Sequence, residues 1–378
     1  MQDNHIISQD IDNKTVLWFE SSNEYLVVEK KTAAIINQLH QGISEDTICN
    51  KLSIDLDIPF EKTMDFIVEL KETVYLPKLN KKEEFVDDYE NVKKPDDWFS
   101  IKYYTIYGKS FKVKFENEEL LSLIHPKFAY LESNVAVKNK NIFEVFKSNG
   151  YIFLYVDDLF VGAWSKKEAH FFQGKFSMEL IQKIYHTSEN DWLGIFHASA
   201  VAKNEKSILF LGDSGNGKST SLALLQANGL TCLADDFVPF SAENLHVYSF
   251  PSAISIKKNS VAVLLPHYPT LKSLAEYEIK GVNKVVRYLP PSQSKVSRHM
   301  ICKDLVFIKY KEGSNFMFKQ ISKTTAFEKL VPDSWISPLR ENVSRFLDWY
   351  SSVNCYELIY SNNQEMLEKV EELFSDEL

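Results

Sequence analysis

Several features that would indicate a familiar protein class are missing from the sequence. It contains no C-x-x-C pair, and its four cysteines are scattered (Cys49, Cys232, Cys302 and Cys355), so neither a zinc site nor a disulfide framework is predicted. No apolar run approaches the roughly 18 residues needed to span a bilayer. The opening MQDNHIISQD lacks the basic-then-apolar pattern of a signal peptide. We therefore expect a cytoplasmic protein with reduced thiols and no membrane partner.

An excess of positive charge is also lacking. The chain has 43 basic and 52 acidic residues and a formal net charge of -9, which gives no broad electrostatic footprint for a nucleic acid. Its 378 residues, 44% of them hydrophobic, are enough for more than one core. We expect a folded, multidomain protein without a nucleic-acid partner; the sequence leaves open whether it forms a homo-oligomer.

The pattern along the chain predicts four segments. Residues 1–80 combine two short strands within 16–30 with three helical stretches, which is a winged-helix-like arrangement. Residues 81–97 are charged and without apolar periodicity, as in a linker. Aromatic alternating runs in 98–190 indicate a mostly antiparallel, strand-rich region, and 191–378 has the mixed composition of an α/β domain.

The helical stretches of the N-terminal segment carry recognisable start signals. KTAAIINQLHQG places Ala34, Ile35 and Leu39 on one predicted face. Ser44 precedes two acidic residues and is a predicted N-cap, and Pro59 stands at the start of the third helix. These signals predict where the second and third helices begin.

The strongest chemical signal is GDSGNGKS, which satisfies G-x-x-x-x-G-K-[ST], the pattern of a loop whose backbone N–H groups wrap a polyphosphate. Such a loop needs glycines for close approach, a lysine for the β- and γ-phosphates and a hydroxyl for Mg²⁺. We therefore predict ATP and Mg²⁺ as cofactors, with the phosphates held by Gly212, Asp213, Ser214, Gly215, Asn216, Gly217, Lys218, Ser219 and Thr220.

The surroundings of this loop support the prediction. The apolar run SILFL comes before it, and the helix-forming TSLALLQANG follows and is closed by Gly229. Strand, loop and helix thus occur in the order that phosphate binding requires. The alternative is a glycine-rich surface turn that matches the pattern by chance.

After the helix, LTCLADD ends in Asp235 and Asp236, which we place at the tip of a strand neighbouring the loop strand. Mg²⁺ needs a carboxylate there, and a second carboxylate could accept the proton of an acceptor hydroxyl. We assign Ser219 and Asp236 to the metal and both aspartates to catalysis together with Lys218, but the sequence leaves open which aspartate has which role. The alternative is an ordinary acidic turn.

Three further residues are weaker candidates. His197 lies before the loop strand, where it could position a phosphate or transfer a proton, or could simply be a core histidine. Lys257 and Arg287 could neutralise phosphate charge, although isolated basic residues are usually solvated.

The triplet HAS at 197–199, GDSGNGKS at 212–219 and ADD at 234–236 together resemble the catalytic domain of HPr kinase/phosphorylase and its relatives. The resemblance covers about residues 190–260. It implies a P-loop kinase fold similar to phosphoenolpyruvate carboxykinase, with His197 in the active site. It also implies that one aspartate accepts the proton of a substrate serine while the other helps to hold the metal.

Thr220 stands where that family commonly has Glu, and its arginine-rich second signature is not found, so phosphorylase activity and HPr itself as substrate are not implied. The chain looks more like divergent HPr-kinase-like proteins found beside peptide-modification systems. A KVVRYLPP-like stretch recurs there, which makes Arg287 a candidate for the nucleotide site. Residues 15–78 in turn are similar to PqqD-like domains, which capture a precursor peptide as an added strand.

These observations favour an ATP- and Mg²⁺-dependent kinase that phosphorylates a serine or other hydroxyl of a peptide or protein. One alternative is a non-catalytic, nucleotide-responsive peptide-binding protein, and another is a small-molecule kinase. Retention of both aspartates favours catalysis. The identity of the acceptor and the reversibility of transfer stay open at the level of sequence.

Overall fold

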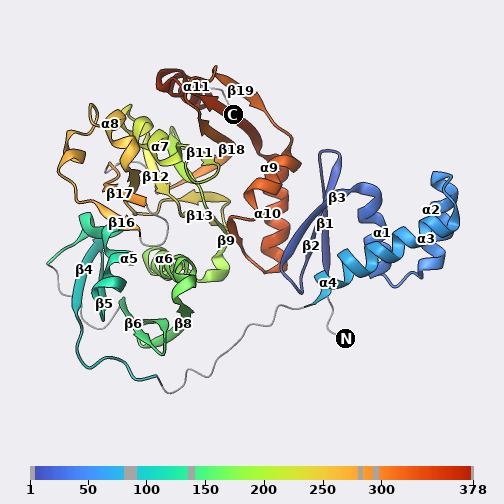
Figure 1. Cartoon of the computed structure of the whole chain (residues 1–378), viewed down its shortest axis with the longest axis horizontal. Coiled ribbons are helices and arrows are strands. Elements are labelled where there is room, and N and C mark those ends of the chain that lie inside the picture. Colours follow the sequence, from blue (N-terminus) through green and yellow to red (C-terminus); the bar gives the residue numbers. More distant parts are fainter. Residues whose placement is uncertain (1–4, 81–91, 135–140, 280–283, 293–297, 376–378) are drawn as a thin grey trace. The chain divides into compact units, whose positions relative to one another are not determined.

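The computed structural model describes residues 5–80, 92–134, 141–279, 284–292 and 298–375 (Figure 1). They belong to two compact units. Unit 1 comprises Met1–Asp87 with Ile321–Ser352, and unit 2 comprises Asp88–Gln320 with Val353–Leu378. Across these described residues, no helix is both long and apolar enough to cross a membrane.

Unit 1 is built on a three-stranded antiparallel sheet in the order β1-β2-β3. Its core is formed by Leu17 and Phe19 of the middle strand together with Ile36 and Ile67 from the helices. The elements are β1 (Ile6–Ile11), β2 (Lys14–Phe19), β3 (Glu24–Glu29), α1 (Lys30–His40), α2 (Glu45–Leu56), α3 (Phe60–Leu70), a π-helical turn (Lys71–Tyr75), α4 (Leu76–Leu79), α9 (Lys323–Leu330), β20 (Ser334–Ile336) and α10 (Arg340–Ser352).

The helix starts expected in unit 1 are confirmed. The Ser44 hydroxyl accepts a hydrogen bond from the Thr47 N–H at 3.3 Å and caps α2, and Pro59 is the N-cap of α3. The face predicted for α1 is wrong at one position, because Ala34 is exposed and Ala33 takes its place in the core. The strand β1 was not expected from the sequence; only its last residue, Ile11, is buried, so its apolar pattern is weak.

Unit 2 contains a mixed parallel and antiparallel sheet with the order β12-β10-β11-β18-β14-β13-β9, and β21 and β19 extend it from β18. The α/β character expected for this part is confirmed. The strands are β9 (Trp192–Phe196), β10 (Ser199–Lys203), β11 (Lys206–Leu211), β12 (Thr231–Asp235), β13 (Val238–Ser241), β14 (His246–Tyr248), β18 (His299–Tyr310), β19 (Met317–Gln320) and β21 (Asn354–Tyr360).

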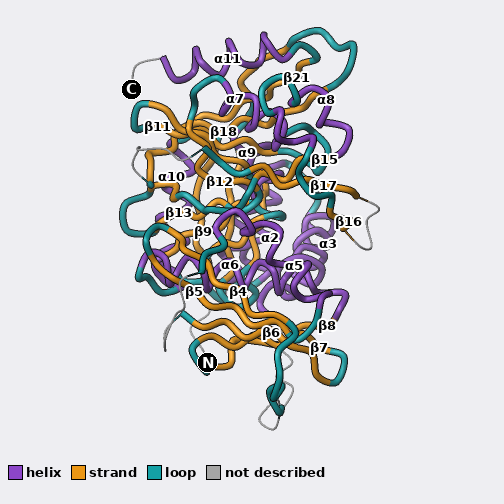
Figure 2. Tube along the Cα trace, turned by 90° about the vertical axis from the view of Figure 1, so that its left-hand side faces the viewer, coloured by secondary structure: helices purple, strands orange, loops and turns teal. Residues whose placement is uncertain are grey.

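Two helices cover this sheet near the loop of interest. α7 (Lys218–Ala227) follows β11 and packs on β10 and β12, and α11 (Asn363–Ser375) packs on α7 and β21 (Figures 1 and 2). The apolar side chains between helices and strands include Leu222, Leu225 and Val306, all fully buried. A small sheet with the order β15-β17-β16 contacts α7 through β15; its strands are β15 (Ile254–Lys257), β16 (Tyr277–Ile279) and β17 (Lys284–Leu289). Three short helical segments lie between β15 and β16 in the chain: a 3₁₀ turn (Lys258–Ser260), α8 (Val261–Leu264) and a second 3₁₀ turn (Pro269–Lys272).

The aromatic region of unit 2 forms a five-stranded sheet, β4-β5-β6-β7-β8, with the parallel pair β5·β6 among antiparallel ones. Its elements are β4 (Ser100–Ile106), β5 (Lys109–Phe115), α5 (Glu118–Phe128), β6 (Ile142–Ser148), β7 (Tyr151–Val156), β8 (Leu159–Ser165) and α6 (Ala169–Tyr185). Most of the predicted linker, 81–91, lies outside the described residues. Nearer the sheet, Lys94 donates to the buried Glu144 at 2.5 Å.

One expectation about the sheet is wrong. The acidic strand β12 is not a neighbour of the loop strand β11, because β10 lies between them and pairs antiparallel with both. A short turn joins β10 and β11 into an antiparallel hairpin, so β10 occupies the position beside β11 that we expected for β12. Asp235 nevertheless contacts Ser219, in the first turn of α7.

Candidate functional site

The loop between β11 and α7 adopts a backbone that its glycines make possible. Gly212, Gly215 and Gly217 have φ of 134°, 108° and 94°. A Cβ on Gly212 would lie 2.9 Å from the carbonyl oxygen of Ile308, and a Cβ on Gly217 would lie 3.2 Å from Cβ of Tyr310. The glycines thus allow the loop to lie against the end of β18, where the Tyr310 N–H donates to the Asn216 carbonyl at 2.9 Å.

Two ammonium groups contact this loop. Lys218 is buried, and its Nζ donates to the carbonyl oxygen of Gly212. Lys257, from the end of β15, places its Nζ 3.3 Å from the Ser214 hydroxyl. Both cations are therefore at a loop that begins an α-helix, where backbone N–H groups and the helix dipole already favour an anion.

The central contact of the site joins the loop to the acidic strand. The Ser219 hydroxyl donates to Oδ1 of Asp235 at 3.1 Å, and the Ser199 hydroxyl donates to the same oxygen at 2.6 Å. The other carboxylate oxygen accepts the Ser255 N–H at 3.1 Å. Asp235 is 3% exposed, so these three donors hold a carboxyl group that is almost out of water.

Burial is the main reason why the pKa of Asp235 is raised to about 7, and the charge of Asp236 adds to the effect. The donors from Ser199, Ser255 and Ser219 act in the opposite direction. A carboxyl group in this state exchanges its proton near neutral pH, and a cation placed beside it would favour the charged form.

Asp236 lies in a different environment from its neighbour. It is the first residue after β12 and has a φ of 64°, and its side chain is 41% exposed. His197 follows β9 and is equally open, with Nε2 3.9 Å from Oδ1 of Asp236 and Nδ1 3.3 Å from the Asp236 main-chain oxygen. The two side chains thus form an accessible acid–base pair next to the buried Asp235.

The predicted residues do not all come together. Ser219 contacts Asp235 and not Asp236, and Thr220 donates to the Ser260 hydroxyl at 2.8 Å. Arg287 donates to the Leu271 carbonyl and to Glu276 at 2.9 Å. Arg287 pairs with the fully buried Ile256 and shares its face of the sheet. The next residue of β17 lies on the opposite face, because successive strand residues alternate.

That next residue, Tyr288, was missed by sequence reasoning. It pairs with Ser255, and burial followed by the charge of Asp236 raises its pKa to about 12. Ser199 and Ser255 were also not singled out as partners of Asp235. Ser199 belongs to the HAS triplet and Ser255 lies two residues before Lys257, but neither position indicates a contact with Asp235. The contacts join strands that are distant in the chain, so the sequence carries no local signal for them.

Among the described residues, no cluster of three or more His, Cys, Asp and Glu side chains could hold a metal ion. The Ser219 and Asp235 oxygens nevertheless fit Mg²⁺, which is commonly bound by one or two protein oxygens together with phosphate oxygens and water. The four cysteines are buried and form no disulfide with one another in the described structure.

Comparisons with known proteins give little to add to this geometry. No protein-family model matches the chain, and no curated protein is significantly similar to it. Among solved structures, the HPr(Ser) kinase/phosphatase from Coxiella burnetii matches at 11% identity, covering 47% of this chain and 88% of that chain, with a TM-score of 0.24. A structural match with so low a TM-score indicates nothing about function. The roles of the site residues therefore follow only from the contacts described above.

Proposed function

We propose that unit 2 is an ATP- and Mg²⁺-dependent phosphotransferase that phosphorylates a serine or other hydroxyl group of a peptide or protein. The observation that carries the proposal is the contact between the loop hydroxyl of Ser219 and the buried Asp235, with the exposed Asp236 and His197 beside it. A phosphate loop, a metal-type oxygen pair and an accessible acid–base pair are the parts that phosphoryl transfer needs.

The buried half of the site is suited to holding the nucleotide. The loop amides and Lys218 would bind the phosphate oxygens, and Lys257 would add a second positive charge at Ser214. Ser219 and Asp235 would hold Mg²⁺, which neutralises developing charge on the phosphates when bound. This division of roles assigns the metal to Asp235, whereas the sequence alone suggested Asp236.

The exposed half is suited to the acceptor. Asp236 would orient the acceptor hydroxyl and take its proton, and His197 would hold the Asp236 carboxylate in place through the Nε2 contact. Both groups are open to solvent, so a peptide could reach them. Positioning and charge stabilisation would supply most of the rate enhancement.

The experiment is transfer of phosphate from γ-labelled ATP to peptides encoded beside the gene. Asp236→Asn should lose at least about 100-fold in turnover while nucleotide affinity changes by less than about threefold. Asp333→Asn, an exposed aspartate of unit 1, is the matched control and should transfer normally. If the unmodified protein binds ATP but labels no such peptide, the nucleotide-responsive binder is the better account.

Residues 15–78 of unit 1 are proposed to bind the peptide. The support is the edge strand β3, which pairs with β2 and with no other strand among the described residues, so one row of its backbone groups can accept an added strand. A fragment limited to residues 1–80 would omit α9 and α10, which belong to the same compact unit. Binding should therefore be measured on the full chain, and loss of affinity in a β3 variant, Val27→Pro, would support the assignment. Unchanged affinity would reject it.

A further inference from the structure

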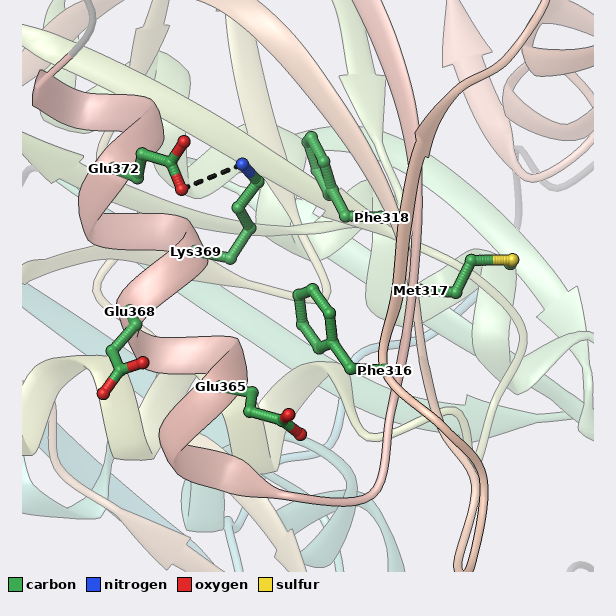
Figure 3. Close-up of a pocket in the computed structure, with 7 residues that line it drawn as sticks. All are labelled: Phe316, Met317, Phe318, Glu365, Glu368, Lys369 and Glu372. Atoms are coloured by element: carbon green, nitrogen blue, oxygen red, sulfur yellow. Dashed lines mark hydrogen bonds and ion pairs between the residues drawn. The ribbon is translucent and has the colours of Figure 1, made fainter.

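A recess of unit 2 lies between β19 and α11, and we call it the β19–α11 cleft (Figure 3). Its volume is about 660 Å³. One wall is residues 316–318, and the other is the face of α11 that carries Glu365, Glu368, Lys369 and Glu372. Counted from Glu365, the other three positions are three, four and seven residues further on, so the four share one side of the helix.

The strand wall offers both side chains and backbone. Phe316 and Phe318 point toward α11, whereas Met317 points away, as expected for alternating residues of a strand (Figure 3). β19 pairs with β21 on one edge, and no other strand of the described residues pairs with its opposite edge. An edge of this kind is a template for one more strand.

A lysine side chain of the protein itself occupies part of the cleft. Nζ of Lys369 lies 4.6 Å from the centre of the Phe318 ring and 2.9 Å from a carboxylate oxygen of Glu372, so an ammonium group sits between an aromatic face and a carboxylate. Phe318 is fixed in turn by stacking on Tyr356, with ring centres 4.9 Å apart. Cation–π attraction and charge pairing favour a cation at this place.

Phe316, Glu365 and Glu368 repeat this combination of an aromatic ring and carboxylates, but no lysine or arginine of the cleft lining lies between them. Glu365 makes no hydrogen bond or ion pair with any described residue, and Glu368 accepts only a neutral amide hydrogen bond from Gln364 at 2.9 Å. The lining thus has three carboxylates against one ammonium group, and the one ammonium is taken by Glu372. The unbalanced charge is negative and lies beside an aromatic side chain.

We propose that the β19–α11 cleft binds an extended, lysine- or arginine-containing segment of a partner protein, which pairs with the free edge of β19. Alternate side chains of such a segment face the same side of the sheet, so basic residues two positions apart would face α11. One of them would lie over Phe316 between Glu365 and Glu368. The proposal does not depend on the phosphate loop.

The test uses the full chain and a fluorescein-labelled peptide in which lysine and valine alternate, with binding followed by fluorescence anisotropy. Reference peptides have glutamate in place of lysine, or the same composition with the lysines in one block. We expect the alternating peptide to bind at least about tenfold more tightly than the acidic one and severalfold more tightly than the block peptide, because only the alternating order fits a strand.

The double variant Glu365→Lys/Glu368→Lys should weaken binding by at least about tenfold, and the milder Glu365→Gln/Glu368→Gln by about threefold, in line with the modest worth of exposed ion pairs. Glu328→Lys, an exposed glutamate of α9 in unit 1, makes the same kind of charge change elsewhere and should leave binding unaltered. Unchanged thermal midpoints would show that the variants fold.

Three results would overturn the proposal. Equal affinity for the alternating and block peptides would mean unspecific charge attraction. Equal affinity in the unmodified protein and both cleft variants would place binding elsewhere. Competition by spermidine at the same concentration as the peptide would mean that the cleft takes small polyamines and does not pair with a strand.

Discussion

The phosphate-loop site and the β19–α11 cleft are two polar regions of the same unit, but they are built differently. At the loop, glycine conformations and one carboxylate that is 3% exposed hold the groups in place. In the cleft, exposed glutamates of α11 face the edge strand β19, and the contact between Lys369 and the Phe318 ring joins the two walls. We therefore expect single substitutions at the loop to cause large losses of nucleotide affinity. In the cleft, peptide affinity should change in smaller steps as charges are removed or reversed.

The largest expected effect is at Lys218. Replacing it by alanine removes the buried ammonium group that would meet the β- and γ-phosphates, and we expect the affinity for Mg²⁺-ATP to fall by at least about 100-fold. Lys257→Ala is the graded companion at the same loop and should cost about tenfold, because Lys257 is less buried. Equal losses at the two positions would contradict the assignment of the leading role to Lys218.

Gly217→Ala should affect both stability and binding. A side chain at a φ of 94° costs about 1–2 kcal/mol, and the added Cβ would press on Tyr310 at 3.2 Å. Gly313→Ala is the control, since Gly313 has a φ of 71° with open space around it. Thermal midpoints should fall in both variants, but nucleotide affinity only in Gly217→Ala. A parallel loss of affinity in Gly313→Ala would show that the close approach to β18 is not what matters.

Asp235 should give the site a characteristic pH dependence. Its pKa is raised to about 7 in the folded chain from an ordinary value of 3.8, so the folded state binds a proton more tightly than the unfolded state. The stability of the nucleotide-free protein should therefore fall as the pH rises from about 4 to about 7 and level off above. Asp235→Asn should remove this part of the profile, as measured by thermal midpoints between pH 5 and 8.

The same carboxyl group couples Mg²⁺ to pH. Because a metal ion needs the charged form, the apparent affinity for Mg²⁺ in the presence of ATP should rise as the pH increases through about 7. The Asp235→Asn variant should show weak Mg²⁺ binding with no such rise, while Asp236→Asn should retain most of it. The reverse pattern in the two variants would return the metal to Asp236.

The smallest effect is expected at Arg287. Its guanidinium is 18% exposed and is engaged by the Leu271 carbonyl and Glu276, on the strand face away from Tyr288. Arg287→Met should therefore change nucleotide affinity by less than about threefold while it lowers the thermal midpoint, because the partner groups lose a buried donor. A larger loss of affinity at unchanged stability would favour the contact with nucleotide suggested by the sequence.

The sequence could predict those parts of the molecule whose signals are local. The strand β11, the loop, the helix α7 and the cap at Ser44 each follow from neighbouring residues, and the structure has all of them. The sequence could not predict that β10 separates β11 from β12, because strand order depends on a hairpin competing with a crossover. Nor could it show which aspartate meets Ser219, since that depends on where α7 lies.

The cleft was beyond the reach of sequence reasoning for the same reason. Residues 316–318 and the glutamates of α11 are separated in the chain by α9, β20, α10 and β21, and only tertiary packing brings them together. The alternating side chains of β19 are too few for a periodic signal. Features assembled from distant segments thus have to be found in the structure.

The most direct measurement of the central claim is calorimetric titration of the purified full chain with ATP, with and without Mg²⁺. If the loop holds the phosphates, we expect a Mg²⁺-dependent binding heat that is lost in Lys218→Ala and persists in Asp236→Asn. The absence of any such heat in the unmodified protein, or the same heat in Lys218→Ala, would contradict it.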